Sequence, residues 1–199
     1  MENARQLFEA KEEYFIRNGA MPRPIVYLNV KSSNIFWMSP GLPNYQILVF
    51  LVPIALEADF FQGNSIDGTI GYIYLEYLDT LHVTEKCDVY GFGVELVEVL
   101  TGHHPIEMFL GYINLVDCFV LSMEENCILR IVDDVVLSQG SNEDIQAFTE
   151  LALRCIKKKG DERPAMREVM LEIRRIQHLV WSKQNNETSS AQTPLKSCN

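Results

Sequence analysis

The chain has 199 residues, of which 47% are hydrophobic and 22% charged, a composition typical of a globular protein of about one domain. Its net charge of -10 argues against nucleic acid or an anionic membrane surface as the main partner. The longest apolar run, Ile47 to Leu56, is about half as long as a membrane span, so no segment is expected to cross a bilayer.

The first third of the chain carries mixed signals. Residues 1–19 are rich in charge and predict a short helix. The β-rich stretch IVYLNV begins at Ile25, behind two prolines. Residues 37–62 combine a turn-like stretch with the apolar run, which favours a buried strand pair or an irregular core segment. Three glycines then predict a loop from Gly63 to Tyr77.

Helical patterns follow this loop. Thr84 is a suitable N-cap, and Gly102 a suitable stop, for a helix that runs to about Leu100. The residues between them are apolar nearly all round, which predicts a buried helix. A second helix is expected to begin near Asn114.

Two more helices are predicted in the last third of the chain. Ser141 and the acid three residues later fit a capping box that opens a helix with one apolar stripe. The lysines at 157–159 are expected in its last turn, where their positive charges interact favourably with the helix dipole. Gly160 is expected to end this helix. Pro164 suits the first turn of the final helix. The polar residues 182–199 predict a disordered tail.

Three stretches of this sequence resemble the C-lobe of a eukaryotic protein kinase, in particular a plant receptor-like kinase of the wall-associated group. GTIGYIYLEYLDTLHVTEKCDVYGFGVELVEVLTG, Gly68 to Gly102, resembles the end of the activation segment and the central helix of that family. LALRCIKKKGDERPAMREVMLEI, Leu151 to Ile173, resembles its last two helices, and Ile25 to Ile35 its catalytic loop. The resemblance implies a mainly α fold, a helical kinase C-lobe with few short strands, as a truncated kinase fold.

The resemblance also divides the chain into three parts. Residues 1–22 are expected to form a charged, juxtamembrane-like helix and linker. Residues 23–181 would be a partial kinase domain, with a degenerate segment at 37–62, and residues 182–199 the tail.

In the catalytic loop, the kinase pattern H-R-D-x-x-x-x-N reads YLNVKSSN, residues 27–34. Asn29 stands where the resemblance places the aspartate that accepts the substrate's proton, and a carboxamide has no useful basicity. Lys31 matches the phosphate-contacting lysine and Asn34 the metal-binding asparagine, and both are interpreted as vestigial. Leu28 replaces the arginine that would pair with a phosphorylated activation segment. No catalytic residue is therefore expected here.

Other parts of the reaction machinery are missing from the sequence. Between Ala20 and Ile25, where the resemblance places the N-lobe, there is no glycine-rich loop and no V-A-I-K strand. An internal deletion or a faulty gene model would both give this pattern. No D-F-G motif occurs in residues 46–59, so the chief magnesium ligand is also missing. No cofactor is expected, and ATP and magnesium are implied by the resemblance alone.

Residues with a structural role in the family are retained. Glu76 matches the glutamate of the A-P-E motif, although Leu75 replaces its proline, and Arg163 matches the arginine that forms a buried pair with that glutamate. Asp88 matches the central-helix aspartate that holds the backbone of the catalytic loop. The sequence thus keeps scaffold residues and lacks reaction residues.

Three hypotheses on function follow from this contrast. The first, which the contrast favours, is a catalytically inactive pseudokinase that acts as a binding or adaptor module in plant receptor or immune signalling. Its partner would be a protein such as a receptor kinase or an immune receptor, and its location cytoplasmic, with the plasma membrane reached through partners. The second is an ATP-dependent Ser/Thr kinase of the receptor-like family represented by an incomplete gene model. The third is an unstable fragment without a function.

Overall fold

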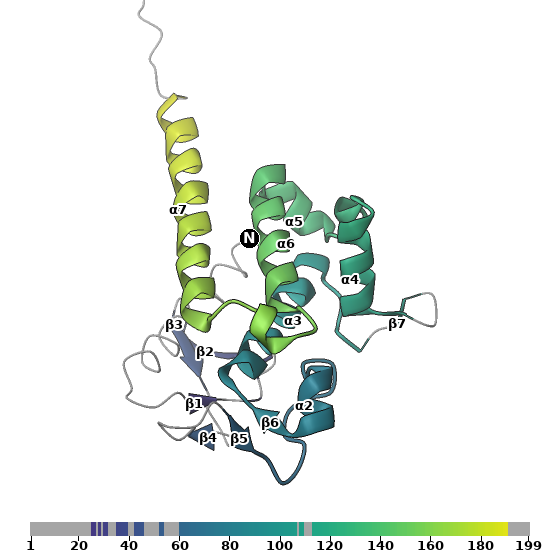
Figure 1. Ribbon diagram of the computed structural model, residues 1–199. Coiled ribbons are helices and arrows are strands. Elements are labelled where there is room, and N and C mark those ends of the chain that lie inside the picture. The colour runs from purple at the N-terminus through teal and green to yellow at the C-terminus, as the bar shows by residue number, and fades with distance from the viewer. Residues whose placement is uncertain are drawn as a thin grey trace, which may run out of the picture.

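The structure of the protein is a computed structural model. It describes residues 25–26, 28, 30–31, 35–39, 42–45, 52–53, 60–106, 108–109 and 113–190. The predicted helix at 1–19 and the last part of the predicted tail, 191–199, lie outside the described residues, as do Asn29 and Asn34. Figure 1 shows a helical body with β1 to β6 at one end and β7 at its side near α4, in agreement with the mainly α fold that the sequence predicts.

The strands of the described residues form four antiparallel pairs. They are β1 (Ile25–Val26) with β4 (Val52–Pro53), β2 (Ile35–Ser39) with β3 (Leu42–Tyr45), β5 (Phe61–Gln62) with β6 (His82–Val83), and β7 (Met108–Phe109) with β8 (Ile113–Asn114). Because each pair has its own register and shares no strand with another, the body does not rest on an extended sheet. Packing between helices therefore supplies most of the described core.

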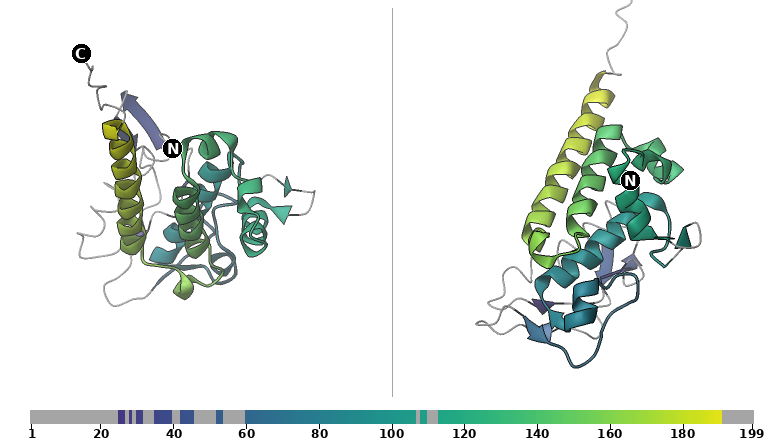
Figure 2. Two further views of the ribbon diagram at one scale, coloured as in Figure 1. Left: turned by 90° about the horizontal axis from the view of Figure 1, so that it is seen from above. Right: turned by 45° about the vertical axis from the view of Figure 1, so that its right-hand side comes forward.

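The central element is α3 (Glu85–Thr101), which the other large helices surround (Figure 2). Its N-cap is Thr84, whose hydroxyl accepts a hydrogen bond from the Lys86 N–H, and it ends at Gly102 in the left-handed conformation with φ of 69°. Both caps agree with the sequence prediction. Most of its residues are buried. A helix that is apolar all round avoids water only when other elements surround it on every side.

Seven further helices, α-helical or 3-10, complete the described body. They are α2 (Leu75–Thr80), α4 (Leu115–Glu124), η2 (Ile128–Arg130), α5 (Asp134–Gln139), α6 (Asn142–Cys155), η3 (Gly160–Glu162) and α7 (Met166–Ser190). Three local predictions are wrong. Helix α2 begins inside the predicted loop, and the lysines at 157–159 follow α6 instead of forming its last turn. Pro164 precedes the first residue of α7 instead of lying in its first turn. The lysines lie outside α6 because the connection turns there to bring η3 against α3.

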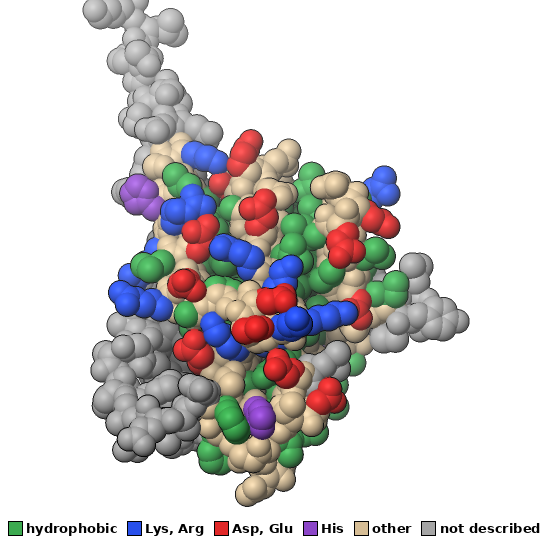
Figure 3. Space-filling view, in the orientation of Figure 1, with side chains coloured by type: hydrophobic (Ala, Val, Ile, Leu, Met, Phe, Trp, Pro, Cys, Tyr) green, Lys and Arg blue, Asp and Glu red, His purple; other side chains and the backbone are tan. Residues whose placement is uncertain are grey.

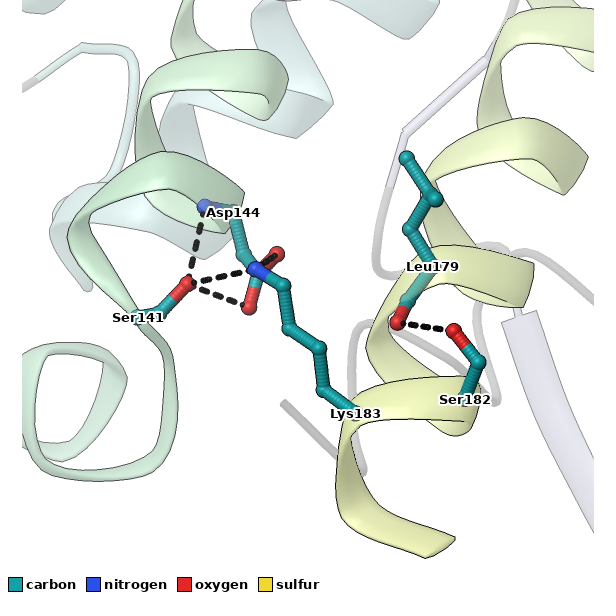
Figure 4. Close-up of polar contacts among 5 residues, drawn as sticks. All are labelled: Ser141, Asp144, Leu179, Ser182 and Lys183. Atoms are coloured by element: carbon teal, nitrogen blue, oxygen red, sulfur yellow. Dashed lines mark hydrogen bonds and ion pairs between the residues drawn. The ribbon is translucent and has the colours of Figure 1, made fainter. Parts of the chain in front are cut away.

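The final helix α7 continues past Ser182, where the disordered tail was predicted to begin, so that prediction is wrong for residues up to the end of α7. Figure 4 shows the reason: α7 runs alongside α6, and Lys183 reaches the N-terminus of that helix. Lys183 Nζ donates to Asp144 Oδ1 at 2.9 Å and to Ser141 Oγ at 3.1 Å. This contact anchors a polar part of the helix that has no apolar stripe to bury.

Replacing Lys183 by alanine is expected to lower the free energy of unfolding by about 0.5–1 kcal/mol at pH 7, because Lys183 is half exposed and partly screened. Burial opposes ionisation of Asp144, but the hydrogen bonds from Lys183 and Ser141 hold its pKa below the ordinary value. The stabilisation is therefore complete above the unfolded-state pKa and is lost as the pH falls through the lowered folded-state pKa.

Urea unfolding of both proteins at pH 7 and in acid checks this prediction. Lys159→Ala is the matched control, because the pair between Lys159 and Glu162 is formed by well-exposed side chains and its loss should leave stability unchanged. A deficit of Lys183→Ala that stays constant down to the most acid pH would contradict the assigned role of Asp144.

Candidate functional site

The degenerate catalytic loop lies against α3 through one buried carboxylate. Asp88 Oδ1 accepts a hydrogen bond from the Leu28 N–H at 2.8 Å, and both residues are buried. Leu28 has φ of 60°, a left-handed conformation that typically strains a residue with a β-carbon by about 1–2 kcal/mol. The hydrogen bond that Asp88 of α3 accepts offsets this strain. The Leu28 side chain packs into a small hydrophobic cluster with Val26, Tyr74 and other residues of that end.

Two glycines allow other parts of the chain to lie close to this loop. A β-carbon on Gly68 would lie 2.7 Å from the carbonyl oxygen of Leu28, and Gly68 also has φ of 127°, so a side chain is excluded there on both grounds. Gly91 in α3 faces the carbonyl oxygen of Val30 at 3.2 Å from where its β-carbon would be. Leu28 thus lies close to the segment that carries Gly68, and Val30 close to the central helix.

Of the vestigial reaction residues, the structure describes Lys31, which is half-buried at the end of the loop and forms no ion pair with another described residue. Asn29 and Asn34 belong to the residues whose placement is not described. A small cavity lies between the loop, Tyr77 and Asp88, with room for roughly one water molecule. It is much too small for a nucleotide. Within the described part of the chain, no three His, Cys, Asp or Glu side chains gather as metal ligands would.

The segment from Gly63 to Tyr74, called here the activation segment, is held by tyrosine hydroxyls. Tyr77 Oη accepts from the Asp67 N–H at 2.9 Å and donates to the Ser65 carbonyl at 3.3 Å. Tyr72 Oη donates to Glu98 Oε2 on α3 at 2.6 Å. Burial raises the pKa of Tyr77, so this hydroxyl is protonated at neutral pH and can donate. The activation segment is therefore fixed at both of its ends.

Glu76 and Arg163 meet at the same junction but do not form the buried pair that the resemblance implies. Glu76 is exposed, and its Oε2 accepts from the Gly160 N–H at 3.2 Å. Arg163 is 3% exposed, and its three guanidinium nitrogens donate to backbone carbonyls, those of Lys157 at 2.7 Å, Lys86 at 2.9 Å and Lys158 at 3.3 Å. No ion pair or hydrogen bond joins Glu76 to Arg163 among the contacts of the described residues.

Sequence reasoning missed the aromatic partners of this arginine. Arg163 Cζ lies 4.1 Å from the centroid of the Tyr74 ring and 4.9 Å from that of Tyr90. The signal was available, because YLE stands where the family has A-P-E, and a tyrosine in place of a small residue adds a ring beside the arginine. Burial lowers the pKa of Arg163 from its usual value. The hydrogen bonds to three carbonyls and the contact with two ring faces act in the opposite sense, because they stabilise the cation.

Replacing Asp88 by alanine is expected to lower the free energy of unfolding by about 2 kcal/mol, because the Leu28 N–H would stay buried without its acceptor. Asp88→Asn is the matched control, since the carboxamide oxygen can still accept that hydrogen bond, and it should lose less than half as much. Chemical unfolding monitored by tryptophan fluorescence and far-UV circular dichroism measures both. Equal losses for the two variants would show that the negative charge, and not the bond to Leu28, is what matters.

A helical body around a buried central helix, with a catalytic-loop-like turn held by that helix, defines the C-lobe of a protein kinase. The comparison with protein families agrees: the model described as protein tyrosine and serine/threonine kinase matches residues 57–173. This chain belongs to that family.

The individual relatives that this chain matches are plant receptor kinases. Wall-associated receptor kinase-like 13 of Arabidopsis thaliana is 44% identical over 157 residues, which are 77% of this chain and 20% of the relative. Wall-associated receptor kinase 2 of Arabidopsis thaliana is 32% identical over 172 residues, which are 83% of this chain and 23% of the relative. The chain thus spans about a fifth of the length of these relatives.

A solved structure supports the fold independently. The pseudokinase domain of BIR2, described as an immune regulator of the RLK/Pelle family, aligns with a TM-score of 0.62 and 27% sequence identity. The alignment covers 82% of this chain and 49% of that domain. The match to about half of a kinase-type domain agrees with a C-lobe-like arrangement.

Proposed function

We propose that this chain is a kinase-related protein without phosphotransferase activity, and that it works by binding another protein in plant receptor signalling. The observation that carries the proposal is the hydrogen bond that the Leu28 N–H, one residue before Asn29, donates to Asp88. The Leu28 backbone is held by the central helix, while the sequence has a carboxamide where the family has its base. A kinase-like backbone that lacks the catalytic base can still bind a protein, but it cannot provide the proton transfer that the reaction needs.

The chemistry of the loop supports the same interpretation. A general base typically contributes roughly 10²–10⁴ in rate, and Asn29 cannot supply it. Without the aspartate of a D-F-G motif, Lys31 and Asn34 have no partner in the sequence with which to hold a metal-bound triphosphate. The proposed binding unit is the kinase-derived part of the chain, residues 23–181.

The relatives and the surface point to the class of partner. The similar solved domain is named as a pseudokinase and an immune regulator, and the curated relatives are receptor kinases. On the face drawn in Figure 3, acidic and basic side chains alternate, which offers no single-sign patch for a nucleic acid. None of the described helices is both long and apolar enough to span a membrane. We therefore infer a protein partner, and specifically the kinase domain of a receptor kinase.

The first experiment tests for phosphoryl transfer from ATP. Radiolabelled ATP, magnesium and a general protein substrate are incubated separately with the purified chain, with the Lys31→Ala variant and with the Asn29→Asp variant. We expect no transfer above the Lys31→Ala control, and no rise in melting temperature at millimolar ATP, since a nucleotide that bound the folded state would raise it by mass action. Transfer by the unmodified chain would refute the proposal.

The second experiment tests whether the chain binds the kinase domain of a receptor kinase. The kinase domain of wall-associated receptor kinase 2 serves as the probe in isothermal titration calorimetry, with a kinase domain from outside the receptor-like group as the control. We expect a saturable complex with the first and none with the second. Binding of neither domain would count against a receptor kinase as the partner, while leaving the result of the transfer assay intact.

A further inference from the structure

The cluster of Arg163, Tyr74 and Tyr90 lies where the activation segment ends. Tyr74 closes that segment, Tyr90 belongs to α3, and Arg163 belongs to the connection between α6 and α7. The two ring centroids are 6.0 Å apart with a tilt of 48°, so the guanidinium lies over two adjoining faces. A cation within about 6 Å of a ring centroid is attracted by the negative ring face, and more strongly where water is excluded.

Each member of this cluster is fixed by other contacts. Arg163 cannot swing away, because its nitrogens donate to the three backbone carbonyls described above. Tyr74 is 4% exposed, and its hydroxyl donates to the His82 carbonyl at 3.5 Å and lies 3.8 Å from Cys87 Sγ. Glu76, in contrast, is exposed and bonded to the backbone of Gly160. Among these side chains, the Tyr74 ring is the one that links the activation segment directly to the arginine.

We propose that Tyr74, and not Glu76, is the positioning residue through which Arg163 holds the end of the activation segment, and that this aromatic latch orders the segment without a phosphate group. Leu28 supports the second half of the proposal, since a buried leucine stands where an arginine would be needed to pair with a phosphorylated segment. At the other end, the Tyr77 hydroxyl fixes Ser65 and Asp67 through neutral hydrogen bonds. The inference does not depend on the proposed binding function.

Hydrogen exchange followed by mass spectrometry tests the latch on protein whose intact mass shows no phosphate. Peptides that cover residues 63–74 report on the activation segment, and peptides from α6 serve as the internal reference. We expect the segment of the unmodified chain to be protected. Tyr74→Leu, which removes the ring face, should speed exchange in the segment about tenfold while α6 is unchanged. Tyr74→Phe keeps the ring and loses only the long hydroxyl contacts, 3.5 Å to the His82 carbonyl and 3.8 Å to Cys87 Sγ, so its segment should stay protected.

Glu76→Gln is the matched control for the ion-pair alternative. The carboxamide oxygen can still accept from the Gly160 N–H, so only the charge is lost, and exchange in the segment should not change. Adding 1 M salt, which shortens the screening length to about 3 Å, should also leave the segment protected, because a desolvated ring contact is screened little. The proposal is overturned if Glu76→Gln loosens the segment as much as Tyr74→Leu, or if the segment of the unmodified chain exchanges like an unstructured peptide.

If Tyr74→Leu does not fold, a second pair of variants decides. Tyr74→Phe is compared with the same protein carrying 3,4,5-trifluorophenylalanine at position 74, which keeps the shape of the ring but removes the negative potential of its face. Faster exchange in residues 63–74 of the fluorinated protein supports the latch. Equal exchange in the two proteins overturns it.

Discussion

Arg163→Ala is expected to lower the free energy of unfolding by about 4 kcal/mol, the largest effect of any single polar substitution considered for this chain. The side chain is almost fully buried, and its removal leaves three backbone carbonyls without their donors and two tyrosine rings without the cation they face. Each abandoned buried acceptor typically costs about 1–3 kcal/mol, reduced where water can enter the space. Urea denaturation at pH 7 measures the loss.

Two further variants separate this effect from a general loss of positive charge. Arg167→Ala removes an exposed arginine from the first turn of α7 and should change stability by less than about 0.5 kcal/mol. Arg163→Lys keeps the charge but lacks the planar fork that reaches three carbonyls at once, so its loss should fall between the other two. Similar stabilities for Arg163→Ala and Arg167→Ala would contradict the buried network.

Gly93→Ala is expected to lower the free energy of unfolding by about 3 kcal/mol, although alanine normally favours the middle of a helix by about 1 kcal/mol over glycine. Gly93 lies in α3 where that helix crosses α6. An added β-carbon would lie 2.6 Å from Cys155 Cβ, 2.8 Å from Ile156 Cγ2 and 3.1 Å from the backbone carbon of Cys155. These neighbours are not the free ends of flexible side chains, so the two helices would have to move apart.

Gly91→Ala provides the matched control in the same helix. Its added β-carbon would lie 3.2 Å from the Val30 carbonyl oxygen, a contact that a shift of a few tenths of an ångström relieves, so its loss of stability should be smaller than that of Gly93→Ala. Thermal unfolding followed by circular dichroism compares the two variants. If Gly93→Ala were as stable as the unmodified chain, the close crossing of α3 and α6 would be wrong.

The sequence predicts the local features of the fold well where a cap and an apolar pattern coincide. Thr84 and Gly102 bracket α3 as expected, and Ser141 opens α6, because capping is decided by residues a few positions apart. The length of α7 could not be predicted in this way. Its polar second half is anchored by Lys183 to Asp144 on another helix, and nothing near Lys183 in the sequence reveals that contact.

The candidate site shows the same division between local and distant information. Matching Asp88 and Arg163 to a family pattern directed attention to residues that the structure places at buried junctions. The expected partner of Arg163 differs, because a pattern gives the residue type and not the direction in which the side chain points. Glu76 turns toward Gly160, and the Tyr74 ring faces the arginine instead. The roles of Asn29, Lys31 and Asn34 stay predictions.

The close crossing of α3 and α6 also shields one of the cysteines of this protein from oxidants. Cys155 is fully enclosed at that crossing, and burial raises the pKa of its thiol to about 12. Burial likewise raises the pKa of Cys87. Since peroxides attack the thiolate and need access to it, both sulfurs are chemically silent while the body stays folded, and oxidation within its described part falls first on the half-buried Cys118 and Cys127.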